Sequence, residues 1–268
     1  MENKLDIDGA KIHIQDVGIG PDLILVHGMG QTSARVWDYV VPELQKNYHI
    51  IRYDLRGHGG STDSSGDQSI IRHARDLKKI VEYYDLDQAS IVGFSFGGTI
   101  AQEFAIRYPK HLNKLVLMTT APGLTDEAAD YYEQRAEFIE NEGIEAHADK
   151  AVSIVLSPWF IDEHPEMAEE YRERFLDNNP RAYAGAMRAM IGWDPTDHLR
   201  ELHRPTLIIG GSLDDTAIMG GEAAGSCHQL NQILPNSELE IIHDTSHYPQ
   251  IEKPNMVAAL IDEFISEN

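Results

Sequence analysis

Residues 89 to 99 of this chain read Ala89-Ser90-Ile91-Val92-Gly93-Phe94-Ser95-Phe96-Gly97-Gly98-Thr99. A β-rich apolar run leads into the pattern Gly-x-Ser-x-Gly, and an apolar stretch typical of a helix follows directly. A sharp strand-to-helix turn exposes its serine as a nucleophile, and small residues on either side let strand and helix pack closely. The alternative is a glycine-rich turn that binds phosphate at a helix N-terminus. We predict that Ser95 is a nucleophile.

Short apolar runs alternate with amphipathic stretches on both sides of this motif. Asp8-Gly9 indicates a hairpin turn between the first two runs. The runs with strand character are residues 5–7, 11–17, 23–26, 48–53, 89–94, 114–118, 206–209 and 238–242. Strands that alternate with helices form parallel sheets covered on both faces. We therefore predict an α/β fold with a doubly wound, mostly parallel, eight-stranded sheet.

One long segment breaks this alternation. Residues 123–203 contain no convincing strand pattern, and residues 128–141, 166–177 and 181–191 are helical in pattern. We predict a helical cap (lid) at 123–203, inserted after the sixth strand into a core formed by residues 1–122 and 204–268. Trp159 and Trp193 each lie beside a proline-marked bend and are candidates to line the acyl pocket. The open alternative is that both anchor the cap on the core.

A serine hydroxyl needs a general base, and position must choose it among 13 histidines. His247 follows the last predicted strand and precedes the last helix, which agrees with the chain order Ser, acid, His. His243 is the nearest rival, but it stands at the strand end, where a structural role is expected. The spacing of these two histidines suits a metal only on a helix, and Pro249 argues against one. We predict no metal and no cofactor.

The base needs an orienting carboxylate, and the tetrahedral intermediate needs two N–H donors. Asp214 and Asp215 both lie on the loop after the strand at 206–209, so either can supply the carboxylate. The expected oxyanion donors are the backbone N–H groups of Phe96, at the start of a helix, and of Met29, in the loop His27-Gly28-Met29-Gly30. His27 is expected to shape that loop.

The chain is strongly acidic, with 22 Lys and Arg against 44 Asp and Glu, a formal charge of −22. Such a field repels nucleic acid and anionic lipid, and it disfavours strongly anionic substrates unless the site supplies positive charge. One cysteine, Cys227, gives no sign of an oxidising compartment. Neither a signal-peptide pattern nor a run of 18 apolar residues is present. We predict a cytoplasmic protein with a small-molecule ester or lactone substrate and no nucleic-acid or membrane partner; a homo-oligomer is left open.

Taken together, these features resemble the α/β-hydrolase fold superfamily over essentially the whole chain. The resemblance rests on His27-Gly28, Asp54-Leu55-Arg56-Gly57-His58-Gly59, the turn around Ser95, Gly211-x-x-Asp214, and His247 followed by Pro249 and Glu252-Lys253-Pro254. In these families the acid commonly stands three residues after a glycine that ends the seventh strand. The resemblance therefore implies Asp214 as the acid.

Within the superfamily the chain is most similar to small capped carboxylesterases and 3-oxoadipate enol-lactonases. Residues 179–186, which lead to Asp194 and Asp197, resemble the enol-lactonase cap. The proline usually found a few residues after the acid is absent here. The resemblance implies a carboxylic ester hydrolase that uses Ser95, His247 and Asp214. A lactonase with the same triad is the alternative. Because the charge of −22 fits a dianionic lactone poorly, neutral esters are ranked above it. A ligand receptor on this fold is a third reading.

Overall fold

A computed structural model describes residues 2–63, 66, 68–214 and 224–267 of the chain. One eight-stranded sheet forms its centre, with the strand order β1-β2-β4-β3-β5-β6-β7-β8. The strands are β1 (Glu2–Ile7), β2 (Ala10–Val17), β3 (Asp22–Val26), β4 (His49–Tyr53), β5 (Ala89–Phe94), β6 (Leu112–Met118), β7 (Thr206–Gly211) and β8 (Ser237–Ile242). β2 pairs antiparallel with β1 and β4, and every other pairing is parallel. The predicted fold class is confirmed.

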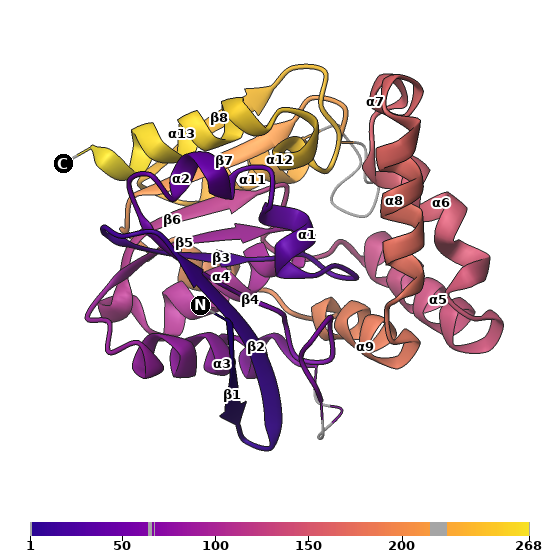
Figure 1. The fold of residues 1–268 in the computed structure, drawn as a ribbon, viewed down its shortest axis with the longest axis horizontal. Helices are drawn as coiled ribbons and strands as arrows, with labels where there is room; N and C mark the ends of the chain where they lie inside the picture. The colour runs from indigo at the N-terminus through magenta and orange to yellow at the C-terminus, as the bar shows by residue number, and fades with distance from the viewer. Residues whose placement is uncertain (1, 64–65, 67, 215–223, 268) are drawn as a thin grey trace.

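Helices cover both faces of this sheet, as a parallel sheet requires. Figure 1 shows α3 (Ile70–Tyr83) and α4 (Phe96–Arg107) on one side and α2 (Val41–Leu44) and α13 (Pro254–Ser266) on the other. The shorter helices of the core are α1 (Ser33–Trp37), α11 (Gly225–Ile233), α12 (Pro249–Glu252) and a 3₁₀ turn at Pro109–His111. All residues of β5 and β7 are buried, which explains why their sequences are continuous apolar runs without alternation.

Six helices separate β6 from β7. They are α5 (Asp126–Glu142), α6 (Glu145–Val155), α7 (Pro158–Glu163), α8 (Pro165–Leu176), α9 (Pro180–Met190) and α10 (Thr196–Leu199). Residues 119–205 are all described and contain no strand. Figure 1 shows α5 to α9 gathered beyond one end of the sheet. The helical cap after the sixth strand is thus confirmed, while the boundaries 123 and 203 between cap and core stay a prediction.

Three of the cap helices match the predicted segments, and α6, α7 and α10 were not predicted. α7 and α10 are only one to two turns long, so their sequences carry no periodic pattern. α7 and α8 each begin with a proline, which suits the first position of a helix because its missing N–H would have no partner there. The helix predicted at 166–177 therefore begins one residue earlier, at Pro165.

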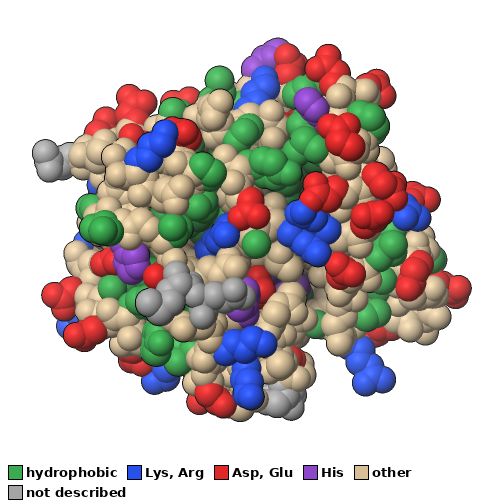
Figure 2. Space-filling model, in the orientation of Figure 1, with side chains coloured by type: hydrophobic (Ala, Val, Ile, Leu, Met, Phe, Trp, Pro, Cys, Tyr) green, Lys and Arg blue, Asp and Glu red, His purple; other side chains and the backbone are tan. Residues whose placement is uncertain are grey.

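The distribution of charge on the surface and the lengths of the helices can be compared with the predicted cytoplasmic location. Figure 2 shows acidic side chains spread over the visible face, with basic side chains in smaller groups among them. Within the described ranges, no helix is long and apolar enough to cross a membrane. The cytoplasmic location stays a prediction.

Candidate active site

Ser95 lies in a strained turn between β5 and α4. Its backbone has φ 53° and ψ −120°, a combination that residues with a side chain rarely adopt. A Cβ on Gly93 would lie 2.5 Å from the carbonyl oxygen of Gly97, and one on Gly97 would lie 2.3 Å from that of Val26. The two glycines are therefore needed for the strand and helix to meet at this serine. The predicted strand–turn–helix is present.

A chain of hydrogen bonds connects three side chains from distant parts of the sequence. His247 Nε2 lies 3.0 Å from Ser95 Oγ, and His247 Nδ1 lies 3.1 and 3.2 Å from the two carboxylate oxygens of Asp214. Asp214 follows the end of β7, and His247 lies between β8 and α12. Because a carboxylate accepts, Nδ1 carries the proton and Nε2 is left to accept from the serine hydroxyl. This arrangement can remove a proton from Ser95.

The rival histidine, His243, does not join this chain of hydrogen bonds. His243 has a side chain that is 84% exposed, and its Nδ1 contacts Asp244 at 2.9 Å. Asp215 lies outside the described residues. The backbone also holds His247 in place, because its carbonyl accepts from Thr119 Oγ1 at 3.0 Å and its N–H donates to the carbonyl of Val155 at 3.1 Å.

Met29 and Phe96, whose backbone N–H groups the sequence predicted as oxyanion donors, both line the cavity at Ser95. Phe96 is the first residue of α4, and the first N–H groups of a helix have no partner inside it. Met29 lines the same cavity as Ser95 and Phe96. Among the described residues, no hydrogen-bond acceptor faces the N–H of Met29 or Phe96. Both groups can therefore donate to a ligand.

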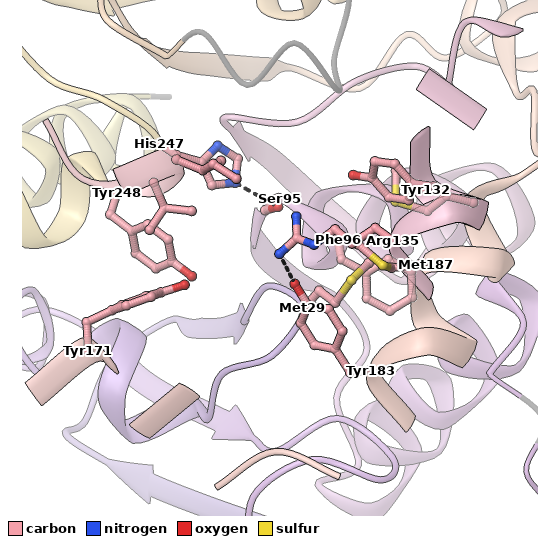
Figure 3. Close-up of a pocket in the computed structure, with 13 residues that line it drawn as sticks. Met29, Ser95, Phe96, Tyr132, Arg135, Tyr171, Tyr183, Met187, His247 and Tyr248 are labelled. Carbon is pink, nitrogen blue, oxygen red and sulfur yellow. Dashed lines mark hydrogen bonds between the residues drawn. The ribbon is translucent and has the colours of Figure 1, made fainter. Parts of the chain in front are cut away.

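A cavity of about 60 Å³ opens at Ser95 (Figure 3). Most of its wall comes from the cap, and sequence analysis missed those residues. The described lining is Met29, Ser95, Phe96, Tyr132, Arg135, Ile154, Val155, Tyr171, Tyr183, Met187, Met190, His247 and Tyr248. Helical spacing was the available signal, because Tyr132 and Arg135 lie one turn apart on α5, as do Tyr183 and Met187 on α9.

Comparison with known proteins identifies the family of this chain. The family model described as the alpha/beta hydrolase fold matches residues 21–254. The chain belongs to the α/β hydrolase family. A curated relative, 3-oxoadipate enol-lactonase 2 of Acinetobacter baylyi, is 27% identical over 87% of this chain and 84% of its own length.

Solved structures of α/β hydrolases superpose over nearly the whole chain. A thermophilic esterase from Thermogutta terrifontis has a TM-score of 0.89 at 27% identity, covering 99% of this chain and 98% of its own. The enol-lactonase from Burkholderia xenovorans has a TM-score of 0.91 at 22% identity, covering 98% and 100%. At that identity the second likeness shows the fold alone.

The two cap tryptophans do not lie in the cavity wall of this α/β hydrolase. Trp159 Nε1 donates to the carbonyl of Asp244 at 2.7 Å, and Trp193 Nε1 donates to the carboxylate of Glu103 at 3.0 Å. Both bonds connect a cap residue to the core. The geometry therefore favours the anchoring alternative for these residues over the predicted acyl pocket.

A buried carboxylate makes a further connection between the cap and the loop of His247. Glu252 accepts from the N–H and the hydroxyl of Ser157, at 2.9 and 2.8 Å, just before α7. The same carboxylate accepts from the N–H of Ser246 at 3.3 Å. Because Ser246 precedes the catalytic candidate His247, the position of that loop depends on the cap.

His27 holds the loop at residues 27–30 as a neutral ring. Its Nε2 accepts from the N–H of Leu55 at 2.8 Å, so its Nδ1 carries the proton and donates to the carbonyl of Gly28 at 2.7 Å. Burial, together with nearby His58, lowers the pKa of His27 from 6.5 to about 4. The ring therefore connects the loop at Gly28 to Leu55, as the predicted shaping role requires. Protonation at Nε2 would break the bond to Leu55.

We expect the free energy of unfolding to fall with acid because of this ring. Between pH 6.5 and 4 the unfolded chain binds the proton and the folded chain does not, so stability rises with pH there. The full contribution of the neutral His27 ring to the free energy of unfolding is present above pH 6.5 and is lost as the pH falls toward 4. The gap between the two pKa values corresponds to roughly 3 kcal/mol.

Urea unfolding at pH 7.5 and pH 5 measures this effect. His27→Asn should lower the stability at pH 7.5 and should reduce the loss on going to pH 5. His243→Gln, at an exposed position, is the matched control and should keep the wild-type pH dependence. An unchanged loss in His27→Asn would show that the buried ring is not its source.

Proposed function

We propose that this hydrolase cleaves carboxylic esters through an acyl-enzyme on Ser95. The observation that carries the proposal is the continuous hydrogen-bonded chain from Ser95 Oγ through His247 to Asp214. Ser95 Oγ attacks the ester carbonyl while its proton passes to His247 Nε2. The N–H groups of Met29 and Phe96 bind the oxyanion, and Asp214 stabilises the imidazolium that forms.

The remaining steps, departure of the alcohol and hydrolysis of the acyl-enzyme, use the same groups. The tetrahedral intermediate collapses, the ester C–O bond breaks, and His247 returns its proton to the departing alcohol. Water then attacks the acyl-enzyme with His247 as base, which releases the acid and restores Ser95. The cavity wall is mostly aromatic, aliphatic and methionine side chains with a few polar groups, a composition that suits a small-molecule substrate.

A lactonase that uses the same triad is the second candidate. The similarity to a protein named as an enol-lactonase supports it. The chemistry differs only in that the departing alcohol stays attached to the acyl group, so the same residues serve both reactions. A receptor that is acylated but does not turn over is the third.

Stopped-flow hydrolysis of p-nitrophenyl acetate tests the proposal. We expect a burst of one p-nitrophenol per protein followed by steady turnover, because an activated ester acylates Ser95 faster than water releases the acetyl group. A fluorophosphonate should label the protein once, at Ser95, by peptide mass spectrometry. Dihydrocoumarin, an aryl lactone, measures the lactonase alternative in parallel.

The outcomes of that experiment are distinct. Acylation without turnover would favour the receptor, and preferential opening of the lactone would favour the lactonase. Labelling at a residue other than Ser95, or no reaction with either substrate, would overturn the serine-hydrolase proposal.

A further inference from the structure

The cavity at Ser95 contains a positive charge that the proposed ester cleavage does not use. Arg135, on α5, is the one permanently charged side chain among the thirteen described residues of the cavity wall, and no carboxylate is among them. Figure 3 shows its guanidinium group directed into the space that Ser95 faces. In a chain with twice as many acidic as basic residues, a cation held apart from carboxylates at this position needs a physical reason.

The contacts of Arg135 leave part of its guanidinium group unused. Its Nη2 donates to the hydroxyl of Tyr183, and its Cζ lies 5.5 Å from the centre of that ring. Its Nε is buried and has no hydrogen-bond acceptor among the described residues. Among the described residues, no carboxylate oxygen lies within 4.0 Å of a guanidinium nitrogen of Arg135, so it forms no ion pair there.

Other shielded arginines of this protein do have carboxylate partners. Arg52, on β4, has a side chain that is 13% exposed and lies 2.6 Å from Asp38. Arg56, fully buried in the core, lies 2.8 Å from Asp76. Arg135 therefore differs from arginines with a structural role, and the difference lies inside the cavity.

The groups around Arg135 do not neutralise it. Burial raises the pKa of the phenols of Tyr132, Tyr171, Tyr183 and Tyr248, all of which line the cavity, above the usual value of 10. The phenols are therefore uncharged at neutral pH. Arg135 is thus a cation in the cavity wall with no carboxylate partner among the described residues, and an anionic ligand is the partner that guanidinium recognises best.

We propose that the substrate is an ester or lactone that also bears a carboxylate, and that Arg135 binds this carboxylate. The inference rests on the serine-hydrolase function proposed above and specifies its substrate class. Because Ser95 and Arg135 share one small cavity, the carboxylate lies a few bonds from the carbonyl that Ser95 attacks. This revises the expected preference for neutral esters.

The acidic surface does not oppose this assignment strongly. Charges on the surface are screened over about 8 Å at physiological salt, whereas a pair inside a desolvated cavity is screened much less. The net charge of −22 therefore slows the approach of an anion. The contact with Arg135 determines how firmly the anion is held.

A matched pair of substrates tests the proposal. Monomethyl glutarate carries a carboxylate, and methyl 4-carbamoylbutanoate has nearly the same shape with a neutral carboxamide in its place. For the wild-type protein we expect kcat/KM to be at least about tenfold higher for the carboxylate, as for other sites that recognise a charged group. Arg135→Gln should lower this ratio to about one, and Arg135→Lys should keep part of it.

Arg181→Gln is the matched control. Arg181 lies near the start of α9, outside the cavity wall, and its side chain is exposed, so the ratio should stay at the wild-type value. A wild-type ratio of one or below, or a tenfold ratio that persists in Arg135→Gln, would overturn the role of Arg135.

Binding separates this proposal from the proposed reaction. Calorimetry on Ser95→Ala protein should give a Kd for monomethyl glutarate at least about tenfold lower than for the carboxamide, and Arg135→Gln in that background should abolish the difference. If wild-type protein does not turn over p-nitrophenyl acetate but this binding difference is present, the hydrolase proposal fails and the carboxylate site stands. If both compounds bind equally and ester turnover is normal, the carboxylate site fails and the hydrolase proposal stands.

Discussion

Ser95→Ala should lower kcat/KM for p-nitrophenyl acetate by about 10⁴-fold or more, because it removes the attacking oxygen. The residual rate should come from the oxyanion donors and the cavity, which the substitution leaves in place. Loss of the hydroxyl should leave the fold intact, because Ser95 Oγ bonds only to His247 among the described residues. Steady-state kinetics, together with thermal unfolding followed by circular dichroism, measure both expectations.

Ser90→Ala is the matched control for this prediction. Ser90 is buried on the same strand, β5, and its hydroxyl oxygen accepts from Asn113 rather than from a residue of the candidate site. We expect its activity to stay close to wild type. Near-normal turnover by a well-folded Ser95→Ala protein would remove the serine-hydrolase proposal altogether.

Asp214→Asn should lower kcat by about 10⁴-fold, the second large effect. The carboxylate of Asp214 accepts from Nδ1 of His247 and so keeps Nε2 free to accept the serine proton. An asparagine amide can instead donate to Nδ1, which places the ring proton on Nε2. That tautomer cannot act as the base for Ser95.

The measurement for Asp214→Asn is kcat across pH 5 to 9. Asp244→Asn is the control, because Asp244 lies in the same loop as His247 but contacts the exposed His243. Its kcat should change little. An active Asp214→Asn together with an inactive Asp215→Asn would move the acid by one residue and leave the rest of the mechanism standing.

The amino-acid sequence by itself determined the sheet and the turn at Ser95, and it predicted His247 as the base. It left Asp214 and Asp215 open as the acid, and the family resemblance selected Asp214. Strands such as β5 and β7 are buried on both faces, so their apolar runs were visible without any structure. The Ser95 turn depends on contacts that a Cβ at Gly93 or Gly97 would block, and such steric demands are written locally in the chain. His247 followed from the order of the elements.

Only the tertiary structure decided which cap residues face Ser95. Periodicity marked α5 and α9 as helices, but the side that each helix turns to the core depends on its packing against other elements. That packing places Arg135, Tyr132 and Tyr183 in the cavity wall. The indole N–H groups of Trp159 and Trp193 instead donate to residues of the core.

The same distinction applies to charge. The net charge of −22 is a property of composition, and it predicted a preference for neutral esters. The charge that a bound substrate meets depends on which side chains are desolvated beside it. That depends on contacts such as that of Arg135 with Tyr183, between residues 48 positions apart in the chain. Folding places Arg135, which has no carboxylate partner among the described residues, in the cavity wall at Ser95. Charges inside a desolvated cavity are screened less than charges on the surface.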